Sequence, residues 1–362
     1  MDKKVRLKDI AKLANVSVGT VDRVIHKRGE VSQESYNRIM AIVEKTGYTP
    51  NLIARTLGSN KSFRIVAVTP EPSQDEYWKF AQDGIVQAQD DWSQYSLQIK
   101  TCHFDLYNRD SFLKAIKAAI RQKPDGLLLA PIFHQEAVKG LALSHQEGIP
   151  FVLFNNNIPS ADPLSFVGQN LYQSGQLGAE LLQLGQQPGT YAILHVYDDI
   201  ANSTHLSEKE KGFKDYFDHL KHTTNVALSL DLNFSHKKTL EKEIKDLLSI
   251  KDLRGLLVTT SKGASLVSRL LDKHGKNGIR LVAYDLLKEN IAQLNKGIID
   301  FLINQNSRQQ ASVGLSHLAN FLLFKKHPAA FLFPLEIITR KNLSSYLPDT
   351  AAAAIQKKQV SV

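Results

Sequence analysis

Apolar and polar residues follow two different patterns along the chain. In residues 7–46 apolar side chains recur every three or four positions, which is the spacing of amphipathic helices. From Phe63 onward, short β-rich apolar runs are mostly separated by helical stretches. The pattern therefore predicts a small all-α head followed by a larger α/β body.

The head is predicted to contain three short helices. In the first, one face carries the apolar residues Leu7, Ile10, Ala11 and Ala14. In the second, one face carries Val18, Val21, Val24 and Ile25. Asn15 suits the left-handed backbone of a tight turn, and Ser17 can cap the second helix through its hydroxyl. This arrangement indicates a helix-turn-helix.

A third helix is expected to start near Ser32 and to stop at Gly47, with Pro50 just beyond. Its spacing predicts that four apolar side chains point inward, namely Tyr36, Ile39, Met40 and Val43. The third helix would then support the first two.

The body is predicted to contain at least eight buried strands. They are RIVAVTP, YSLQIKTC, DGLLLAP, IPFVLF, TYAILHVY, NVALSLDL, RGLLVTT and IRLVAYD. Helical stretches lie between most of them, for example at 110–122, 173–184, 238–248 and 265–274. Alternating strands and helices form parallel sheets covered on both faces. Two groups of about four units indicate two doubly wound α/β lobes.

Composition and charge narrow the function. The 362 residues are 43% hydrophobic and 22% charged, which is typical of a globular protein, and the single Cys102 excludes an intrachain disulfide or a cysteine-rich zinc site. Residues 1–62 carry 12 Lys and Arg against 6 Asp and Glu, whereas the remaining residues are nearly balanced. A basic head indicates binding to a polyanion, although a solvated basic face is the alternative.

Targeting and membrane signals are not found in the sequence. The N-terminus MDKKVRLKD is charged and is not followed by the apolar stretch of a signal peptide. No apolar run approaches the roughly 20 residues that span a membrane. We therefore expect a cytoplasmic protein without a membrane partner.

The α/β body also raises the question of an enzyme. The turn after the first strand, TPEPSQDEYW, has no glycine, so a dinucleotide fingerprint is missing there. The chain also lacks GxxxxGK[ST], HExxH and GxSxG. We expect no catalysis, no cofactor and no metal.

The order of residues in the head adds a resemblance. VRLKDIAKLANVSVGTVDRVIH, followed by VSQESYNRIMAIVEKTGYTPNLIARTLGS, resembles the headpiece of LacI/GalR transcription regulators. The resemblance implies DNA binding by a recognition helix from Val18 to His26. It assigns base contacts to Val18, Gly19 and Arg23 and phosphate contacts to Ser17 and Thr20. Asp22 and His26 depart from the usual serine and asparagine, so the preferred base sequence is expected to differ.

The segment that follows the head resembles the hinge helix of that family. Eight residues, 51–58, are too few for a stable isolated helix in water, and the resemblance implies that they order when two subunits sit on DNA. It assigns minor-groove positions to Asn51, Ala54 and Leu57, with the leucine wedged between base pairs. A flexible linker with an exposed leucine is the alternative.

The body, from Ser62 to Asn342, resembles the type I periplasmic binding protein fold that senses effectors in this family. The resemblance implies a ligand between two lobes at the carboxyl ends of the strands. Tyr77 and Trp78 would stack on a sugar ring, Asp285 would accept its hydroxyls, and Gln305 would lie at a lobe crossover. The alternatives are packing for the two aromatic residues and a strand-end cap for Asp285.

Four further positions of the implied site depart from the pattern of the relatives. Asn155 and Asn156 stand in place of an Asp-Arg pair, Lys209 in place of an arginine, and Thr260 in place of an asparagine. Amides keep hydrogen bonding but lose fixed charges. We therefore expect a polyhydroxylated ligand whose identity cannot be carried over from the relatives.

Together these observations predict a helix-turn-helix head (1–50), a hinge and linker (51–62), a two-lobed effector domain (63–346) and a tail (347–362). The expected protein is a homodimeric regulator, most simply a repressor, that binds a roughly palindromic double-stranded DNA operator under the control of a small sugar-like effector. A solute-binding protein of a sugar transport system is the alternative. The tail has no leucine heptads, which disfavours a tetramerising coiled coil.

Overall fold

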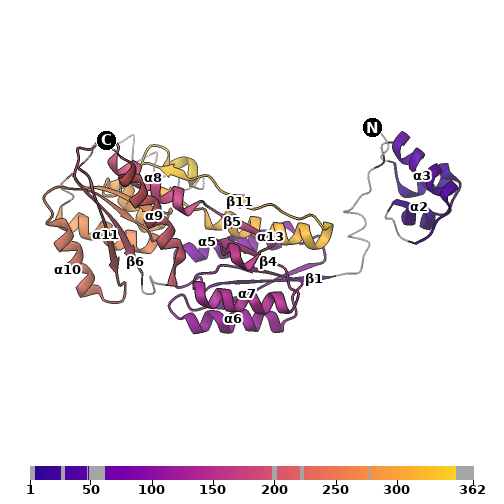
Figure 1. The fold of residues 1–362 in the computed structure, drawn as a ribbon, viewed down its shortest axis with the longest axis horizontal. Coiled ribbons are helices and arrows are strands. Elements are labelled where there is room, and N and C mark those ends of the chain that lie inside the picture. The colour runs from indigo at the N-terminus through magenta and orange to yellow at the C-terminus, as the bar shows by residue number, and fades with distance from the viewer. Residues whose placement is uncertain are drawn as a thin grey trace. The chain divides into compact units, whose positions relative to one another are not determined.

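The structure is a computed structural model that describes residues 5–25, 29–46, 48, 62–197, 202–220, 224–275 and 278–347. The chain divides into two compact units, Met1–Lys61 and Ser62–Val362. Figure 1 shows the elements of both units in chain order. No helix among the described residues is long and apolar enough to cross a membrane.

The head consists of three helices around a small core. They are α1 (Leu7–Ala14), α2 (Val18–Ile25) and α3 (Gln33–Thr46). Asn15 adopts the left-handed conformation with φ of 49°, and the backbone N–H of Thr20 donates to Ser17 Oγ over 3.1 Å. The expected turn and cap are thus confirmed.

One expectation for α3 is wrong. Tyr36 and Met40 are 36% and 39% exposed, whereas Ile39 is fully buried and Val43 is partly buried. Three short helices enclose a core of only six buried apolar residues, so α3 buries a narrower stripe than the sequence spacing indicated.

The first lobe of the body is built on a six-stranded sheet. Its strands are β1 (Phe63–Pro70), β2 (Leu97–Phe104), β3 (Gly126–Leu129), β4 (Phe151–Asn155), β5 (Ser165–Gly168) and β11 (Phe331–Leu332). They pair in parallel in the order β11-β5-β4-β3-β1-β2. In the register of the sheet, Ile65 of β1 lies opposite Ile99 of β2.

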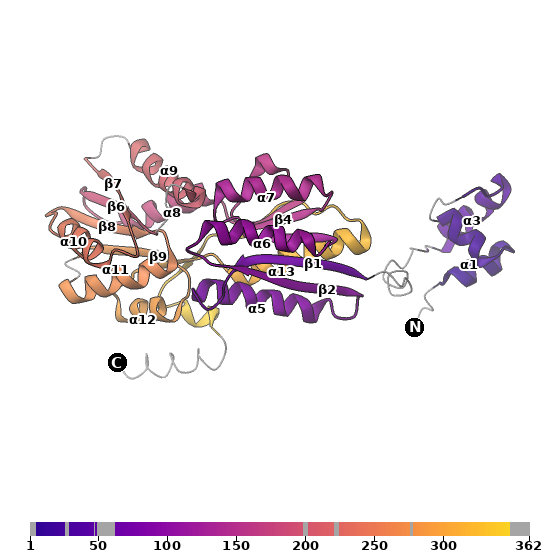
Figure 2. The same cartoon turned by 90° about the horizontal axis from the view of Figure 1, so that it is seen from below.

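Helices cover both faces of this sheet, as Figure 2 shows. One face carries α6 (Arg109–Arg121) and α7 (His134–Gln146), and the other carries α5 (Glu76–Asp91) and α13 (Ser307–Phe324). A short 3-10 turn, η1 (Pro159–Ala161), connects β4 to β5. The strands are buried on both sides, which explains their near-continuous apolar runs.

The second lobe repeats this plan. Its strands are β6 (Thr190–Val196), β7 (Val226–Leu232), β8 (Leu253–Val258), β9 (Arg280–Tyr284), β10 (Phe301–Asn304) and β12 (Glu336–Ile338). Their order is β12-β10-β9-β8-β6-β7, and β12 is antiparallel to β10. The helices are α8 (Leu171–Gln183), α9 (Thr204–His219), α10 (Lys237–Leu248), α11 (Ser261–His274) and α12 (Lys288–Lys296), and a 3-10 turn η3 (Leu343–Tyr346) follows β12.

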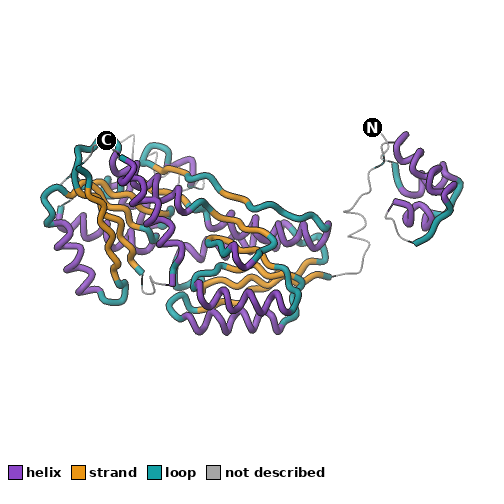
Figure 3. The backbone as a smooth tube through the Cα atoms, in the orientation of Figure 1, coloured by secondary structure: helices purple, strands orange, loops and turns teal. Residues whose placement is uncertain are grey.

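The chain passes between the lobes three times. It leaves the first lobe after β5, returns after β10 with α13, and leaves again between β11 and β12. Figure 3 shows the two sheets, each with its own flanking helices. The expected pair of α/β lobes is confirmed, and the crossings bring the carboxyl ends of both sheets to one cleft.

Candidate functional site

A pocket lies between the two lobes at the carboxyl ends of the strands. Its volume is about 80 Å³. It is lined by Asp75, Tyr77, Trp78, Leu106, Ile132, Asn155, Tyr197, His205, Lys209, Thr259, Thr260, Ser261 and Gln305. Six of the eight ligand-binding residues expected from the sequence are therefore brought together. The other two, Asn156 and Asp285, lie directly behind lining residues.

The two aromatic residues are held by the start of α5. Asp75 caps this helix, and its Oδ1 accepts a hydrogen bond from the backbone N–H of Tyr77 over 2.9 Å. The Trp78 ring lies edge-on to Tyr77, with centroids 5.0 Å apart, and it also packs edge-on against Phe154. Both rings are almost fully buried, so they form a rigid apolar wall of the pocket.

Asn155 and Asn156 form an amide pair at the end of β4. Asn155 is left-handed with φ of 70°, and its Nδ2 donates to the Tyr77 hydroxyl. Asn156 Nδ2 donates to His205 Nδ1 over 3.3 Å, while its buried Oδ1 has no partner among the described residues. Burial, with a smaller effect of the Lys209 charge, lowers the pKa of His205 to about 3, so this ring is neutral.

Lys209 enters the pocket from α9 of the second lobe and is almost completely buried. Its Nζ donates to the Thr259 carbonyl over 3.2 Å and to Gln305 Oε1 over 3.3 Å, and it lies 3.5 Å from the centre of the Tyr284 ring. Burial lowers the pKa of Lys209 to about 7, and the charge of Asp285 opposes that shift.

Asp285 lies behind the pocket wall, immediately after β9. Its Oδ1 accepts from the backbone N–H of Gln305 over 2.9 Å. Its Oδ2 accepts from Gln305 Nε2 over 2.7 Å and from the Ser261 hydroxyl. Burial raises the pKa of Asp285, whereas these donors and Lys209 hold it down. Gln305 thus links Lys209 to Asp285 at the point where the chain leaves β10 for α13.

Thr260 stands at the N-cap position of α11. Its hydroxyl donates to the carbonyl of Val196 over 3.0 Å, which joins the ends of β6 and β8. The residue therefore both lines the pocket and ties neighbouring strands together.

Several lining residues were missed by sequence reasoning. The most informative is Asp75, because burial raises its pKa to about 6 although it faces the pocket. Its signal was available, since an aspartate directly before a helical stretch is a typical N-cap. The contributions of His205 and Ser261 depend on how the lobes meet, and no local pattern indicates them. Among the described residues, no group of three or more His, Cys, Asp or Glu could hold a metal ion.

The head presents the expected recognition helix to its surface. Val18 is 48% exposed, and Gly19 and Arg23 are also exposed. Thr20 is half-buried, and its hydroxyl lies 2.9 Å from the Ser17 hydroxyl. The other expected DNA contacts, Asn51, Ala54 and Leu57, lie outside the described residues, as does His26 at the end of the helix.

Comparison with known proteins agrees with this architecture. Residues 66–326 match the periplasmic binding protein domain, and residues 6–51 match the lacI family of bacterial regulatory proteins. The chain resembles the ribose operon repressor of Halalkalibacterium halodurans, with 23% identity over 77% of this chain and 80% of that protein. It is 27% identical to the transcriptional regulator DegA of Bacillus subtilis over 50% of this chain and about half (53%) of DegA.

A solved structure is similar as well. A protein from Bacteroides fragilis described as a LacI transcriptional regulator superposes with a TM-score of 0.72 and 26% identity, covering 79% of this chain and 100% of that chain. A two-lobed body with a helix-turn-helix head defines a ligand-sensing regulator. The chain belongs to the periplasmic binding protein family over its body, and its head is a domain of the lacI family of bacterial regulatory proteins.

Proposed function

We propose that this protein is a homodimeric, cytoplasmic repressor whose binding to a roughly palindromic operator is controlled by a small polyhydroxylated effector. Residues 1–50 would read DNA, 51–62 would form the hinge, 63–346 would sense the effector, and 347–362 would be a tail. Within this proposal the protein has no catalytic role. The observation that carries it is the chemistry of the interlobe pocket.

The pocket combines flat apolar rings with many fixed polar groups. Tyr77 and Trp78 offer apolar surface to the C–H face of a sugar ring, and lysine, amides and hydroxyls face the same space. Hydroxyl groups both donate and accept hydrogen bonds, so a polyhydroxylated solute can satisfy such a mixed set. At about 10–15 Å³ for each water-sized group, the 80 Å³ pocket holds roughly five to eight such groups, so it suits a small solute.

The charges favour a neutral effector. Asp75 and Asp285 place two carboxyl groups at or behind the wall, against the single buried amine of Lys209. Asn155 and Asn156 add hydrogen-bonding groups without charge. A sugar acid or sugar phosphate would bring a further negative charge to these carboxyl groups. Lys209, the lysine among the described lining residues, already donates to Thr259 and Gln305.

The head supports the DNA part of the proposal. Arg23 is exposed on the recognition helix, where its planar fork could donate to guanine O6 and N7. Effector-driven closure of the lobes would bias the hinge between ordered and disordered states. By linkage, an effector that weakens operator binding must itself bind less tightly to the operator complex.

The alternative is a solute-binding protein of a transport system, because the body has the fold of such proteins. The head disfavours it, since a helix-turn-helix adds nothing to solute capture. Selection of bound sequences from random duplex DNA separates the two functions: a regulator should enrich one palindromic motif. Leu57→Ala should then weaken binding to that motif by a few kcal/mol.

The effector is tested by thermal shift with D-ribose, D-arabinose, D-glucose, D-galactose and myo-inositol. These probes follow the ligands of relatives, including a ribose operon repressor and binding proteins crystallised with D-arabinose or myo-inositol. At least one neutral probe should raise the melting temperature, and Asp285→Ala should abolish that rise while operator binding persists. A rise given only by anionic sugars would contradict the proposal.

A further inference from the structure

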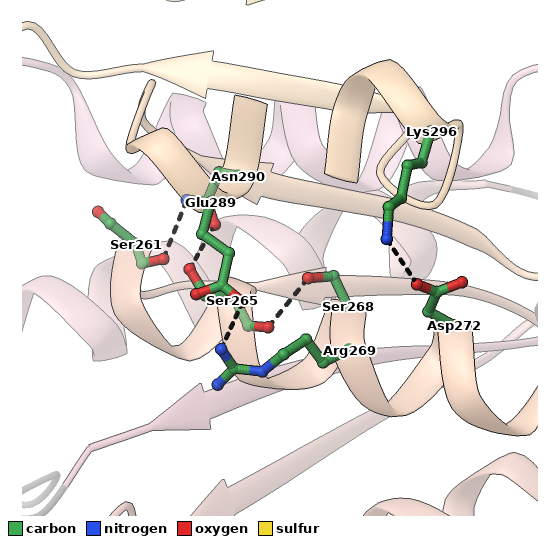
Figure 4. A network of polar contacts seen from close by, with 8 residues as sticks. All are labelled: Ser261, Ser265, Ser268, Arg269, Asp272, Glu289, Asn290 and Lys296. Atoms are coloured by element: carbon green, nitrogen blue, oxygen red, sulfur yellow. Dashed lines mark hydrogen bonds and ion pairs between the residues drawn. The ribbon is translucent and has the colours of Figure 1, made fainter. Parts of the chain in front are cut away.

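Asn290, near the start of α12, is completely buried and joins two backbone segments behind the pocket. Its Nδ2 donates to the carbonyl oxygens of Ser261 and Tyr284, each over 3.0 Å, and of Asp285 over 3.3 Å. Its Oδ1 accepts from the Ser265 hydroxyl over 2.8 Å. Figure 4 shows this side chain bonded to Ser261 and Ser265 of α11.

The surroundings permit only one orientation of this amide. Three carbonyl oxygens surround Nδ2, and a hydroxyl donor faces Oδ1. In the flipped amide, Oδ1 would face the three carbonyl oxygens. Acceptors that face one another in a buried space lose their hydrogen bonds, which costs free energy. The amide is therefore held in one orientation, because both its NH2 group and its oxygen are hydrogen-bonded.

The fastened segments are those that present the Asp285 carboxylate. Asp285 adopts a left-handed backbone with φ of 65°, a conformation that costs a non-glycine residue free energy and needs support from its surroundings. The Ser261 hydroxyl donates to Asp285 Oδ2, and Asn290 holds the backbone carbonyls of both residues. The carboxylate and its hydroxyl donor are thus held by one side chain outside the pocket lining.

We propose that Asn290 is a positioning residue for effector binding, acting through Ser261 and Asp285. The effect on affinity rests on the proposed sugar-binding function of the pocket, whereas the effect on the local backbone does not. Asn290 would fix the distance between the two segments, so that Asp285 holds the lining residues Ser261 and Gln305 in place for an incoming ligand without rearrangement.

Two exposed ion pairs on the same helices supply matched controls. Arg269 of α11 pairs with Glu289 of α12, and Lys296 pairs with Asp272 over 3.1 Å, as Figure 4 also shows. Both pairs join the two helices, and none of the four side chains makes a hydrogen bond to the turn after β9 among the described residues. Glu289→Gln therefore alters the residue next to Asn290 and weakens the same helix contact, but it leaves the turn intact.

The first test needs no effector. In hydrogen–deuterium exchange on the ligand-free full chain, Asn290→Ala should raise exchange in peptides carrying 260–262 and 284–287, and the β6 peptide should stay protected. Glu289→Gln should leave all of these peptides unchanged. A uniform rise over the second lobe, or no rise at the turn, would overturn the proposal. If Asn290→Ala does not fold, Ser265→Ala, which removes only the orienting hydroxyl, should give a smaller change in the same peptides.

The second test measures affinity for the probe sugar or myo-inositol that binds the wild-type protein. Asn290→Ala should weaken it about ten- to a hundredfold, the scale on which supporting residues act on site ligands. In combination with Ser261→Ala the loss should be smaller than the product of the two single losses, because both act on one carboxylate. Unchanged affinity, or losses that multiply in full, would overturn the role. If no probe binds the wild-type protein, the sugar assignment fails, and the exchange experiment still decides the positioning.

Discussion

Gly175 of α8 packs against the backbone of Lys209 on α9, so closely that a Cβ on the glycine would lie 1.9 Å from the Lys209 carbonyl oxygen. The contact is reciprocal, because a Cβ on Gly212 of α9 would lie 1.9 Å from the carbonyl oxygen of Tyr172 on α8. Two glycines thus let the helices touch backbone to backbone. This crossing sets the depth at which the Lys209 amine enters the pocket.

Gly175→Ala should therefore both destabilise the second lobe and displace Lys209. Overpacking typically costs about 1–3 kcal/mol, and here rigid backbone must move, so we expect at least that loss in urea unfolding. Gly178→Ala on the same helix is the control, because its Cβ would meet only the flexible end of the Leu257 side chain. Equal losses for the two variants would contradict a special role for the crossing.

The partly buried carboxyl of Asp75 predicts a pH dependence of stability. Its pKa is raised from 3.8 to about 6, chiefly by burial, so between pH 4 and 6 the folded state binds more protons than the unfolded state. Stability should accordingly fall as pH rises through this window. Asp75→Asn keeps the acceptor for Tyr77 and removes the charge. Above pH 6 it should raise the free energy of unfolding by at most about 3 kcal/mol, at about 1.4 kcal/mol per pKa unit.

The difference between Asp75→Asn and the wild-type protein should vanish below about pH 4, where both side chains are neutral. Urea unfolding followed by circular dichroism at several pH values measures it. Asp83→Asn, on the exposed face of α5, serves as the control. Identical pH profiles for Asp75→Asn and wild type would show that the carboxyl is not desolvated as described.

The two tryptophans should report differently on the pocket. Trp78 lines it, whereas Trp92 donates its indole N–H to the Ser316 hydroxyl over 3.2 Å and is not among the lining residues. Binding of a neutral sugar should change intrinsic fluorescence. Trp78→Phe should remove most of the change, and Trp92→Phe should preserve it. A signal that disappears with Trp92 instead would place the binding site elsewhere.

Arg23 is expected to read a base, because it is exposed on the recognition helix. Arg23→Ala should cost roughly 1–3 kcal/mol on the selected operator and relax the preference at one base pair in each half-site. Lys12→Ala removes the same charge from an exposed site on α1, and any loss that it causes should be equal on all sequences and flatten the salt dependence. Gel-shift titrations over single-base operator variants distinguish the two patterns. A sequence-independent loss for Arg23→Ala would make it a phosphate contact.

Local patterns were sufficient for the architecture. The spacing of apolar residues predicted three head helices and two α/β lobes. A helix or strand that buries one face needs apolar residues at regular intervals, and these intervals are visible in the sequence. The Asn15 turn and the Ser17 cap were predicted for the same reason, since their hydrogen bonds join near neighbours. The short strands β5, β10, β11 and β12 were not predicted. Two to four residues carry little periodic signal, and their pairing depends on distant strands.

The sequence by itself, read with its family resemblance, predicted which side chains would meet a sugar-like effector and which face of α2 would meet DNA. Tertiary structure decided how the pocket residues act on one another. Lys209, Gln305 and Asp285 form one chain of hydrogen bonds only because α9, the end of β10 and the end of β9 meet at the lobe crossover. The hydrogen bonds of Asn290 likewise join residues up to 29 positions apart in the sequence. A side chain becomes buried and gains such hydrogen-bond partners only when distant segments pack together. The sequence states which side chain stands at a position, but this packing sets its pKa and its orientation.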